Sequence, residues 1–529
     1  MHLTTLIRGG MVLDGTGREG EIADVGIAGD HIEAVAPRLA AEADAVVDAT
    51  GLVVSPGFID IHAHGDLYAL MAPEAPARLH DGVTIEVLGN CGESPFPQSG
   101  EMLAERADSA ERNGVAVEWA TLDDYARRHD EVGTGINRAS LVGHGNVRRA
   151  VMGEADRAPT PDELDAMRRE VEAAMEAGAF GMSTGLIYAP CMYAEPAEIE
   201  ALCEVVARHG GLYASHIRGE GDSLERSLEE FVGAGRRTGV RLEHSHAKVS
   251  GRGNWGKADR VIAWIEGVRA EGIDLACDRY PYIASSTSLS SLLPGWAREG
   301  GREPMLERID TPADRERILG EVNGANTDWA RWQAIQVANA ACDAWRHAEG
   351  RSLSDLADEH GREPAELVLD LLAASDGRAS MVAFSMCEEN LEKWLRLPFV
   401  AIGSDSSSRS ADGPTSVGKP HPRSFGTSAR FLGRYVRERR VVELPDAVRR
   451  LTGLPASRLG LKLRGVLRPG AYADVTVFDP DTIADRATYQ EPQQYSTGVR
   501  WVFVNGKAAV ADGELTGVRN GCFIRRGAE

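Results

Sequence analysis

Two histidines one residue apart mark the first stretch of this sequence that could do chemistry. His62 and His64 follow a largely apolar run from Val53 to Ile61. In a β-strand the side chains at positions i and i+2 lie on the same face, so both imidazoles would point to one place. A shared metal ion would explain this spacing, and a pair of structural or solvent-facing histidines would explain it equally well. The remaining ligands must be sought downstream.

Seven further apolar runs follow, separated by segments with helical patterns. The runs cover residues 84–88, 139–144, 179–183, 211–216, 240–246, 273–278 and 399–405. One intervening helix is predicted from Thr160 and Pro161, because threonine caps helices and proline suits the first helical position. Eight strands that alternate with helices indicate the α/β class and, within it, a (β/α)8 TIM-like barrel.

Residues that can bind a metal end most of these runs. In chain order the run ends are His62 and His64, Cys91, His144, Ser183, His216, His246, Asp278 and Asp405. Catalytic groups of barrel enzymes lie at the carboxyl ends of the strands. Imidazole, thiolate and carboxylate suit Zn²⁺, which acidifies water at an open coordination position. Packing alone does not explain this distribution, so the pattern predicts metal-dependent hydrolysis.

The two ends of the chain have a different texture. Residues 1–52 and 461–529 alternate polar and apolar positions between glycine-containing turns, which is typical of half-buried strands. Neither part is large enough to fold alone, so we expect them to pair into one small β-sandwich beside a barrel at 53–460. The longest gap between runs, about 279–398, is expected to be an insertion after the seventh strand that shapes the substrate pocket.

The composition excludes several classes of function. The formal charge of −22 over 529 residues argues against nucleic acid and against an anionic membrane surface as partners. The sequence has no secretion signal and no apolar run near the ~18 residues of a transmembrane helix. Seven scattered cysteines suggest a reducing compartment, so a cytoplasmic protein is expected. An exposed sandwich edge could pair chains into a homo-oligomer.

Several short motifs carry a resemblance to a known family. They are His62-x-His64-x-Asp66, Gly89–Gly92, Gly185–Tyr188, Ala214–Glu220, Ser245–Lys248, Gly403–Asp405, His421–Thr427 and Gly465–Asp474. Together they resemble the amidohydrolase superfamily and, more narrowly, the D-aminoacylases, or N-acyl-D-amino-acid deacylases. The match extends over nearly the whole chain and does not define the substrate side chain.

The resemblance implies a ligand set and a reaction. Cys91, His216 and His246 would form a tight zinc site, and His62, His64 and Asp405 a second site that is weaker or empty. Asp405 would act as general base and then as general acid, while zinc would polarise the scissile carbonyl. The implied reaction is hydrolysis of the amide bond of a small N-acyl-D-amino acid, which releases a carboxylate and a free D-amino acid.

The same resemblance implies the residues that bind substrate. Lys248, Tyr280 and Tyr282 resemble the family's carboxylate-binding group. Arg423 is a further candidate, for which a solvated surface charge is the alternative. Tyr188 would line the pocket.

Three residues need separate interpretation. His244 shares strand parity with His246, so parity alone allows either to bind the metal, and the register of the Ser245–Lys248 motif favours His246. His144 is expected to support the site or the fold and not to bind metal. Ser406 stands where relatives usually have a glycine after this aspartate. The bulkier side chain could change the substrate pocket, which leaves the identity of the substrate open.

Two alternative functions fit the sequence less well. A hydrolase of cyclic amides or dipeptides, similar to hydantoinases and isoaspartyl dipeptidases, would favour a bridging lysine or glutamate, whereas this chain has Cys91 and ends its fourth run in Met182-Ser183-Thr184. A barrel scaffold without catalysis would not need all six ligand-type residues.

Overall fold

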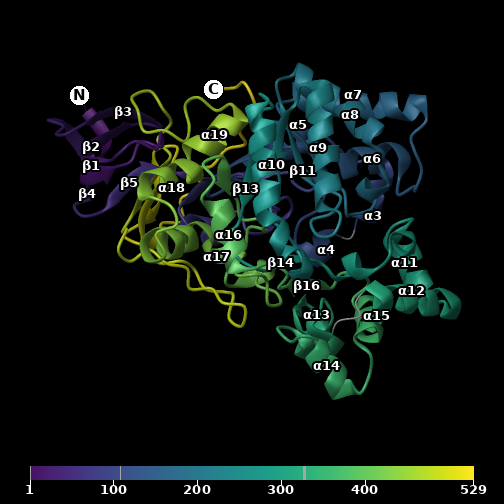
Figure 1. Cartoon of the computed structure of the whole chain (residues 1–529). Coiled ribbons are helices and arrows are strands. Elements are labelled where there is room, and N and C mark those ends of the chain that lie inside the picture. Colours follow the sequence, from purple (N-terminus) through teal and green to yellow (C-terminus); the bar gives the residue numbers. More distant parts are fainter. Residues whose placement is uncertain (1, 108, 326–328) are drawn as a thin grey trace.

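Parallel strands alternating with helices form the centre of the molecule (Figure 1). The computed structural model describes residues 2–107, 109–325 and 329–529. In chain order the parallel strands are β6 (Phe58–Asp60), β7 (Val83–Leu88), β8 (Asn137–Ser140), β9 (Val142–Gly143), β10 (Gly181–Gly185), β11 (Leu212–His216), β12 (Arg241–His244), β13 (Leu275–Arg279) and β17 (Val400–Ile402). Each predicted run therefore contains strand structure.

These strands belong to two parallel sheets, β6-β7-β8 and β9-β10-β11-β12-β13-β17. Only Leu141 separates β8 from β9, and its N–H donates to the carbonyl of Leu88 at 3.0 Å. At the other edge the segments that follow β6 and β17 are bonded to each other. Asp405 N–H donates to His62 O at 2.7 Å, and His64 N–H donates to Ser406 O at 2.9 Å. The carboxyl ends of the first and last strands therefore meet.

The connecting helices cover the strands through one apolar face. They include α7 (Pro161–Glu176), α8 (Pro196–Arg208), α9 (Leu224–Thr238) and α10 (Ala258–Ala270). Helix α7 begins where the sequence predicts: the Thr160 hydroxyl accepts from Glu163 N–H, and the Glu163 carboxylate accepts from Thr160 N–H. No helix in the described ranges is both long and apolar enough to cross a membrane.

Strands from both ends of the chain share one sheet of nine strands. The N-terminal strands are β1 (His2–Val12), β2 (Glu21–Ala28), β3 (His31–Ala36), β4 (Glu42–Asp48) and β5 (Val53–Pro56), and the C-terminal ones are β18 (Val475–Phe478), β19 (Val499–Val504), β20 (Lys507–Ala511) and β21 (Glu514–Leu515). The antiparallel pair β5–β18, in which Val54 faces Val477, joins the two ends within this sheet, and Ile32 N–H also donates to Ala471 O at 2.8 Å.

The first predicted run is thereby divided between two sheets. Val53–Pro56 pairs with β1 and β18, whereas Phe58–Asp60 pairs with β7. Gly57 lies at the changeover, where a Cβ atom would stand 2.1 Å from the Thr84 hydroxyl. Only glycine, which has no Cβ atom, allows the backbone to pass this close to Thr84. Because the change of sheet depends on this contact with a residue distant in the sequence, the local pattern of apolar residues could not show it.

Between β13 and β17 the chain forms a separate lobe, drawn in green at the bottom of Figure 1. Its elements include an antiparallel sheet of β14 (Ser285–Ser288), β16 (Ser380–Ala383) and β15 (Ile335–Asn339), with helices α11 (Arg302–Asp310), α12 (Pro312–Ala325), α14 (Leu353–His360) and α15 (Pro364–Ala374). These helices have a core of their own. The last helix before β17, α16 (Glu388–Leu395), returns to α10 through an ion pair between Lys393 and Asp259 at 2.9 Å.

Candidate active site

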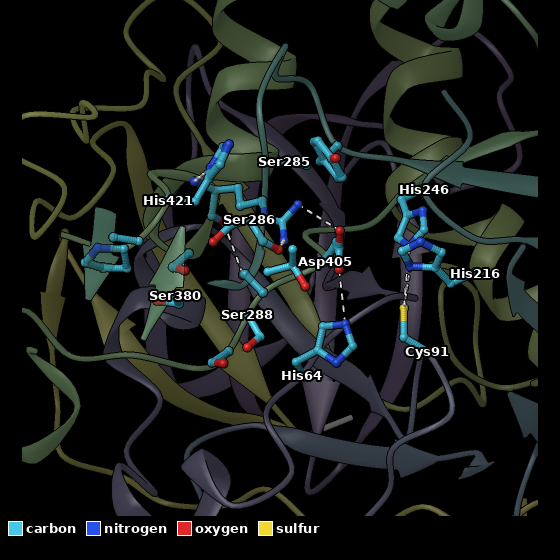
Figure 2. Close-up of a pocket in the computed structure, with 18 of the residues that line it drawn as sticks. His64, Cys91, His216, His246, Ser285, Ser286, Ser288, Ser380, Asp405 and His421 are labelled. Carbon is cyan, nitrogen blue, oxygen red and sulfur yellow. Dashed lines mark hydrogen bonds and ion pairs between the residues drawn. The ribbon is translucent and has the colours of Figure 1, made fainter. Parts of the chain in front are cut away.

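Cys91 lies among three buried histidines at the carboxyl ends of the parallel strands. Figure 2 shows two of these histidines, His216 and His246, beside Cys91. The sulfur of Cys91 is 3.4 Å from Nε2 of His62, 3.4 Å from Nε2 of His246 and 3.8 Å from Nδ1 of His216. Burial opposes ionisation of the thiol, but the charges of His62 and His246 hold the pKa of Cys91 well below its usual range. A thiolate surrounded by imidazole nitrogens is the result.

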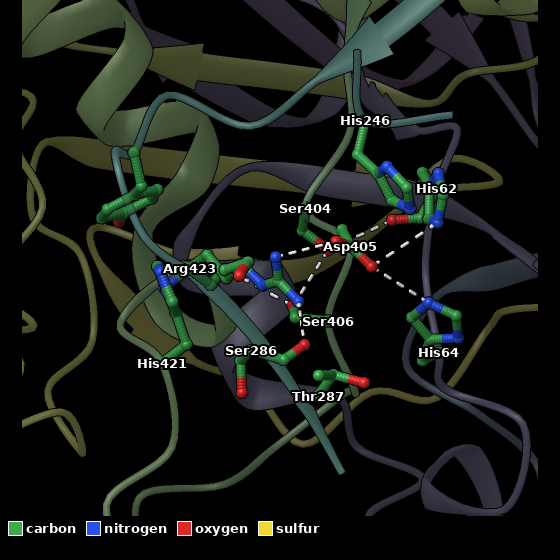
Figure 3. A network of polar contacts seen from close by, with 12 residues as sticks. His62, His64, His246, Ser286, Thr287, Ser404, Asp405, Ser406, His421 and Arg423 are labelled. Carbon is green, nitrogen blue, oxygen red and sulfur yellow. Dashed lines mark hydrogen bonds and ion pairs between the residues drawn. The ribbon is translucent and has the colours of Figure 1, made fainter. Parts of the chain in front are cut away.

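Asp405 adds a carboxylate to this group next to His62 and His64 (Figure 3). Its Oδ1 is 3.1 Å from Nε2 of His64 and 3.6 Å from Nε2 of His62, and its Oδ2 accepts a hydrogen bond of 2.7 Å from Arg423 Nη1. Burial favours the neutral acid, yet the charges of Arg423 and His246 hold the pKa of Asp405 well below its usual range. Asp405 is therefore ionised, as a metal ligand or a general base must be.

The arrangement fits a zinc ion. Ligand atoms of His62, Cys91, His246 and Asp405 lie within 4.8 Å of one another, and those of His216, Glu220 and His246 form an overlapping group. Nε2 of His216 is buried without a hydrogen-bond partner in the described residues. Burial lowers the pKa of His216, so its imidazole is neutral and keeps a lone pair. Thiolate, imidazole and carboxylate are the donors that Zn²⁺ prefers.

Three of these residues have left-handed backbones: Cys91 at φ 51°, His246 at φ 39° and Asp405 at φ 50°. Such conformations cost about 1–3 kcal/mol each outside glycine and persist where the surroundings enforce them. The Ser183 hydroxyl braces the Cys91 loop, because it accepts from Gly92 N–H at 2.9 Å and donates to Gly89 O at 2.5 Å.

Asp278 has a role that the sequence did not assign. Its carboxylate lies 3.1 Å from Nδ1 of His62 and accepts from His246 N–H at 2.8 Å. It therefore orients one imidazole and the backbone that carries another. The only sequence signal was its place at a strand end.

Glu220, the last residue of the Ala214–Glu220 motif, is a further site residue. Its Oε1 lies 3.1 Å from Nδ1 of His246 and contacts Nζ of Lys248, and its Oε2 lies 3.8 Å from Nε2 of His216. Spacing of four residues from His216 was the available signal. A spacing of four residues brings two side chains together only in a helix, and no helix was predicted there, so the spacing did not predict that Glu220 lies near His216.

Most of the expected substrate-binding residues line one cavity of about 360 Å³ beside the histidines. Lys248, Tyr188, Tyr280 and Arg423 are among its lining residues. Tyr280 is buried, with Arg423 Cζ 4.5 Å and Lys248 Nζ 5.9 Å from its ring centre. Tyr188 is bonded to the Thr287 hydroxyl at 2.9 Å. Two cations and two phenols thus face the same space.

Tyr282 lies elsewhere. Its hydroxyl donates to Gly426 O at 3.2 Å, its ring packs on His421 at 5.0 Å between centres, and it does not line the described cavity. Tyr280 and Tyr282 follow the end of β13, where no strand alternation holds their side chains on one face. Sequence proximity therefore did not determine which tyrosine faces the cavity.

The two additional histidines contact other residues than Cys91. His244 packs between the rings of Phe231 and Trp394, and burial lowers its pKa to about 3. Strand β12 ends at His244, and the left-handed turn at His246 breaks the parity between them. His144 lies 2.8 Å from Glu198; burial opposes its protonation, but Cys191 and Glu198 raise its pKa to about 9.

Ser406 takes part in the support of Asp405. Its hydroxyl donates to the Ser404 hydroxyl at 3.0 Å, and its carbonyl accepts from Arg78 Nη2 at 2.8 Å. It also lines the cavity. The serine thus anchors the loop as well as narrowing the pocket.

Comparison with known proteins places this site in a family context. The model of the amidohydrolase family matches residues 45–510. N-acyl-D-glutamate deacylase of Alcaligenes xylosoxydans xylosoxydans is 38% identical over 99% of this chain and 97% of its own length. The crystal structure of N-acyl-D-glutamate deacylase from Bordetella bronchiseptica, complexed with zinc and a phosphonate that mimics the tetrahedral intermediate, superposes with a TM-score of 0.83 at 36% identity, covering 99% of this chain and 100% of that one.

A D-aminoacylase structure gives the same TM-score of 0.83 at 34% identity, with coverage of 99% and 100%. That enzyme is described as having a binuclear metal centre with one-metal activation and second-metal attenuation. Similarity over the whole length at these identities extends well beyond a shared fold. The chain belongs to the amidohydrolase family and, within it, to the group of D-aminoacylases and related N-acyl-D-amino-acid deacylases.

Proposed function

We propose that the protein is a zinc-dependent hydrolase that cleaves the amide bond of N-acyl-D-amino acids into a carboxylate and a free D-amino acid. The observation that carries this proposal is the ionised Asp405 beside the Cys91–histidine group, in one cavity with the cations of Lys248 and Arg423. The activities named for the relatives support the choice of substrate.

Zinc would be held most tightly by Cys91, His216 and His246. His62 and His64, with Asp405, would offer a second site that is weaker or empty. The one-metal activation described for a related D-aminoacylase supports this division. When bound, zinc polarises the scissile carbonyl and lowers the pKa of water.

The chain's own residues supply the proton transfers and the orientation. Oδ1 of Asp405 would accept a proton from the attacking water and later give it to the leaving nitrogen. Arg423, bonded to Oδ2, keeps the carboxylate ionised until then. Lys248 and Tyr280 would bind the α-carboxylate of the substrate, which places the amide next to the Cys91 group.

We also propose the finer architecture that the strand pattern suggests. The parallel strands would close into a (β/α)8 barrel at about 53–460, supported by the backbone bonds between the segments after β6 and β17. Residues 1–52 and 461–529 would form a small β-sandwich, supported by their shared sheet. A cytoplasmic location agrees with seven free cysteine thiols.

The test combines metal analysis with turnover. The purified protein should contain about one tightly bound zinc per chain, and Cys91→Ala should lose both the zinc and the hydrolysis of N-acetyl-D-amino acids. Cys387→Ala, at a half-buried cysteine in the insertion, is the matched control and should keep both. Full activity in a metal-free preparation would refute the metal-dependent mechanism. Equal rates on paired D and L substrates would refute the proposed chirality alone.

A further inference from the structure

Glu220 contacts both histidines of the proposed tight zinc site and also Lys248. Its Oε1 lies 3.1 Å from Nδ1 of His246 and is bonded to Nζ of Lys248. Its Oε2 lies 3.8 Å from Nε2 of His216, which is too long for a hydrogen bond but short enough for direct electrostatic attraction. One carboxylate therefore faces three groups that the proposed function uses.

Each of these two histidines turns one ring nitrogen toward Cys91 and the other toward Glu220. In His246 the nitrogen near the sulfur is Nε2, at 3.4 Å, and in His216 it is Nδ1, at 3.8 Å. A neutral imidazole holds a proton on one nitrogen and a lone pair on the other. The nitrogen toward Cys91 can bind zinc only if the proton stays on the nitrogen toward Glu220.

Lys248 favours the opposite tautomer of His246. Its Nζ lies 2.7 Å from Nδ1 of His246. An ammonium group only donates hydrogen bonds, so a bond from Lys248 to Nδ1 requires the lone pair there and leaves the ring proton on Nε2, toward Cys91. A carboxylate only accepts, so Glu220 holds the proton on Nδ1 and also takes up the charge of Lys248.

His62 shows the same arrangement with a different carboxylate. Its Nδ1 lies 3.1 Å from Asp278, and its Nε2 lies 3.4 Å from the sulfur of Cys91. All three histidines around the sulfur thus have a carboxylate at the nitrogen that points away from it. An outer carboxylate of this kind fixes the tautomer and the ring orientation of a metal-binding histidine.

From these contacts we infer that Glu220 is a positioning residue, which selects the tautomers of His216 and His246 that can bind zinc against the competing donor Lys248. The inference rests on the proposed zinc-dependent function and concerns the formation of its metal site.

The alternative is that Glu220 binds a metal ion itself, since ligand atoms of His216, Glu220 and His246 lie close together. The ammonium group of Lys248 opposes this arrangement. It contacts Oε1 of Glu220 and Nδ1 of His246, and it would repel a second cation placed between those atoms.

Zinc affinity, measured by competition with a chelator, tests the inference. Glu220→Gln keeps the shape of the side chain but removes the charge and offers an amide, which donates as well as accepts. This variant should bind zinc at least about tenfold more weakly than the wild type. Glu229→Gln, at an exposed position of α9, is the control and should bind zinc like the wild type. Unchanged affinity in a folded Glu220→Gln variant would overturn the inference, whereas a wild-type protein that binds no zinc would refute the proposed function.

Removal of the competing donor separates positioning from direct ligation. With Lys248→Met added, the Glu220→Gln protein should bind zinc at least about threefold more tightly than with Glu220→Gln alone, because no donor then occupies the lone pair on Nδ1 of His246. The absorption spectrum of the Co²⁺-loaded proteins is a second readout, and it should change in Glu220→Gln and return toward the wild-type spectrum in the double variant. A double variant that binds zinc no better than Glu220→Gln would overturn the inference and favour direct ligation. If Glu220→Gln does not fold, Glu220→Asp, whose carboxylate is one methylene group shorter, takes its place in both comparisons.

Discussion

Cys91, His246 and Asp405 share a backbone conformation that L-amino acids rarely adopt, with φ between 39° and 51°. The same three residues supply the sulfur, nitrogen and oxygen atoms that meet at the candidate metal site. Each conformation is held by contacts from elsewhere, such as the bond from Asp405 N–H to His62 O. The strained backbone at these positions directs the three side chains across the cavity. Zinc binding is a function that would account for the energetic cost of this strain.

Asp405→Asn should separate metal binding from proton transfer. The amide cannot accept a proton from water, so kcat should fall about 10²–10⁴-fold. The zinc that we propose is held by Cys91, His216 and His246 should remain. Steady-state kinetics and metal analysis on the same preparation measure the two effects, with Asp412→Asn on the exposed part of the same loop as control. A variant that keeps more than a tenth of the kcat would exclude Asp405 as the proton carrier.

At the scale of elements, a buried ion cluster fixes the loop after β17 to β7. Glu86 on β7 accepts from Arg78 Nε at 2.9 Å and from Arg138 Nε at 2.8 Å, and the Ser408 hydroxyl donates to it at 2.7 Å. Arg78 in turn donates to the carbonyl of Ser406, next to Asp405. The cluster therefore ties β7 and β8 to the loop that carries Asp405.

Glu86→Gln should destabilise the protein in a pH-dependent way. Burial opposes ionisation, but Arg138 and Arg78 lower the pKa of Glu86 to about 2. Because this value lies below that of an unfolded glutamate, Glu86 stabilises the fold above about pH 4.3, and the contribution is lost as pH falls toward 2. The shift corresponds to roughly 3 kcal/mol at neutral pH.

Urea unfolding at pH 7 and pH 4 measures this effect. The difference between wild type and Glu86→Gln should be large at pH 7 and smaller at pH 4. Glu118→Gln, at an exposed position, should show little difference at either pH. A gap that widens on acidification would contradict the ionised state of Glu86.

At the scale of the whole molecule, two parts line the cavity and a third part joins them from outside it. The parallel strands bring the ligand residues to one end, the insertion supplies the opposite wall, and the terminal sheet joins the first strand through β5. Ligand residues come from positions 62 to 405 of the chain, so the metal site exists only when the fold is complete. Metal binding should therefore be linked to global stability.

Removal of the metal should lower the unfolding temperature. A ligand present at 1,000 times its Kd stabilises the native state by about 4 kcal/mol, which for a large domain amounts to some 5–15 °C. Thermal unfolding monitored before chelation, after chelation and after addition of zinc measures the shift. Cys91→Ala should give no response to zinc. An unchanged transition after verified zinc removal would show that the metal site is not coupled to the fold.

The sequence alone determined which segments become strands and which residues end them. The period of apolar residues is a local property, so the runs that end near Cys91, His216, His246 and Asp405 could be found without a structure. The same holds for the start of α7 at Thr160, where the cap and its partner are three residues apart. The family motifs then indicated the roles of these residues, because the motifs are defined by residue types at fixed spacings along the chain and can be recognised without a structure.

The tertiary structure decided where the side chains point in the segments that follow each strand. Strand parity fails beyond the last paired residue, which is why His246 faces the sulfur while His244 packs against Trp394. Glu220 and Asp278 became site residues only when other strands brought histidines to within about 3 Å of them. Side-chain direction in a turn depends on φ angles that distant contacts enforce, and no local pattern encodes those contacts.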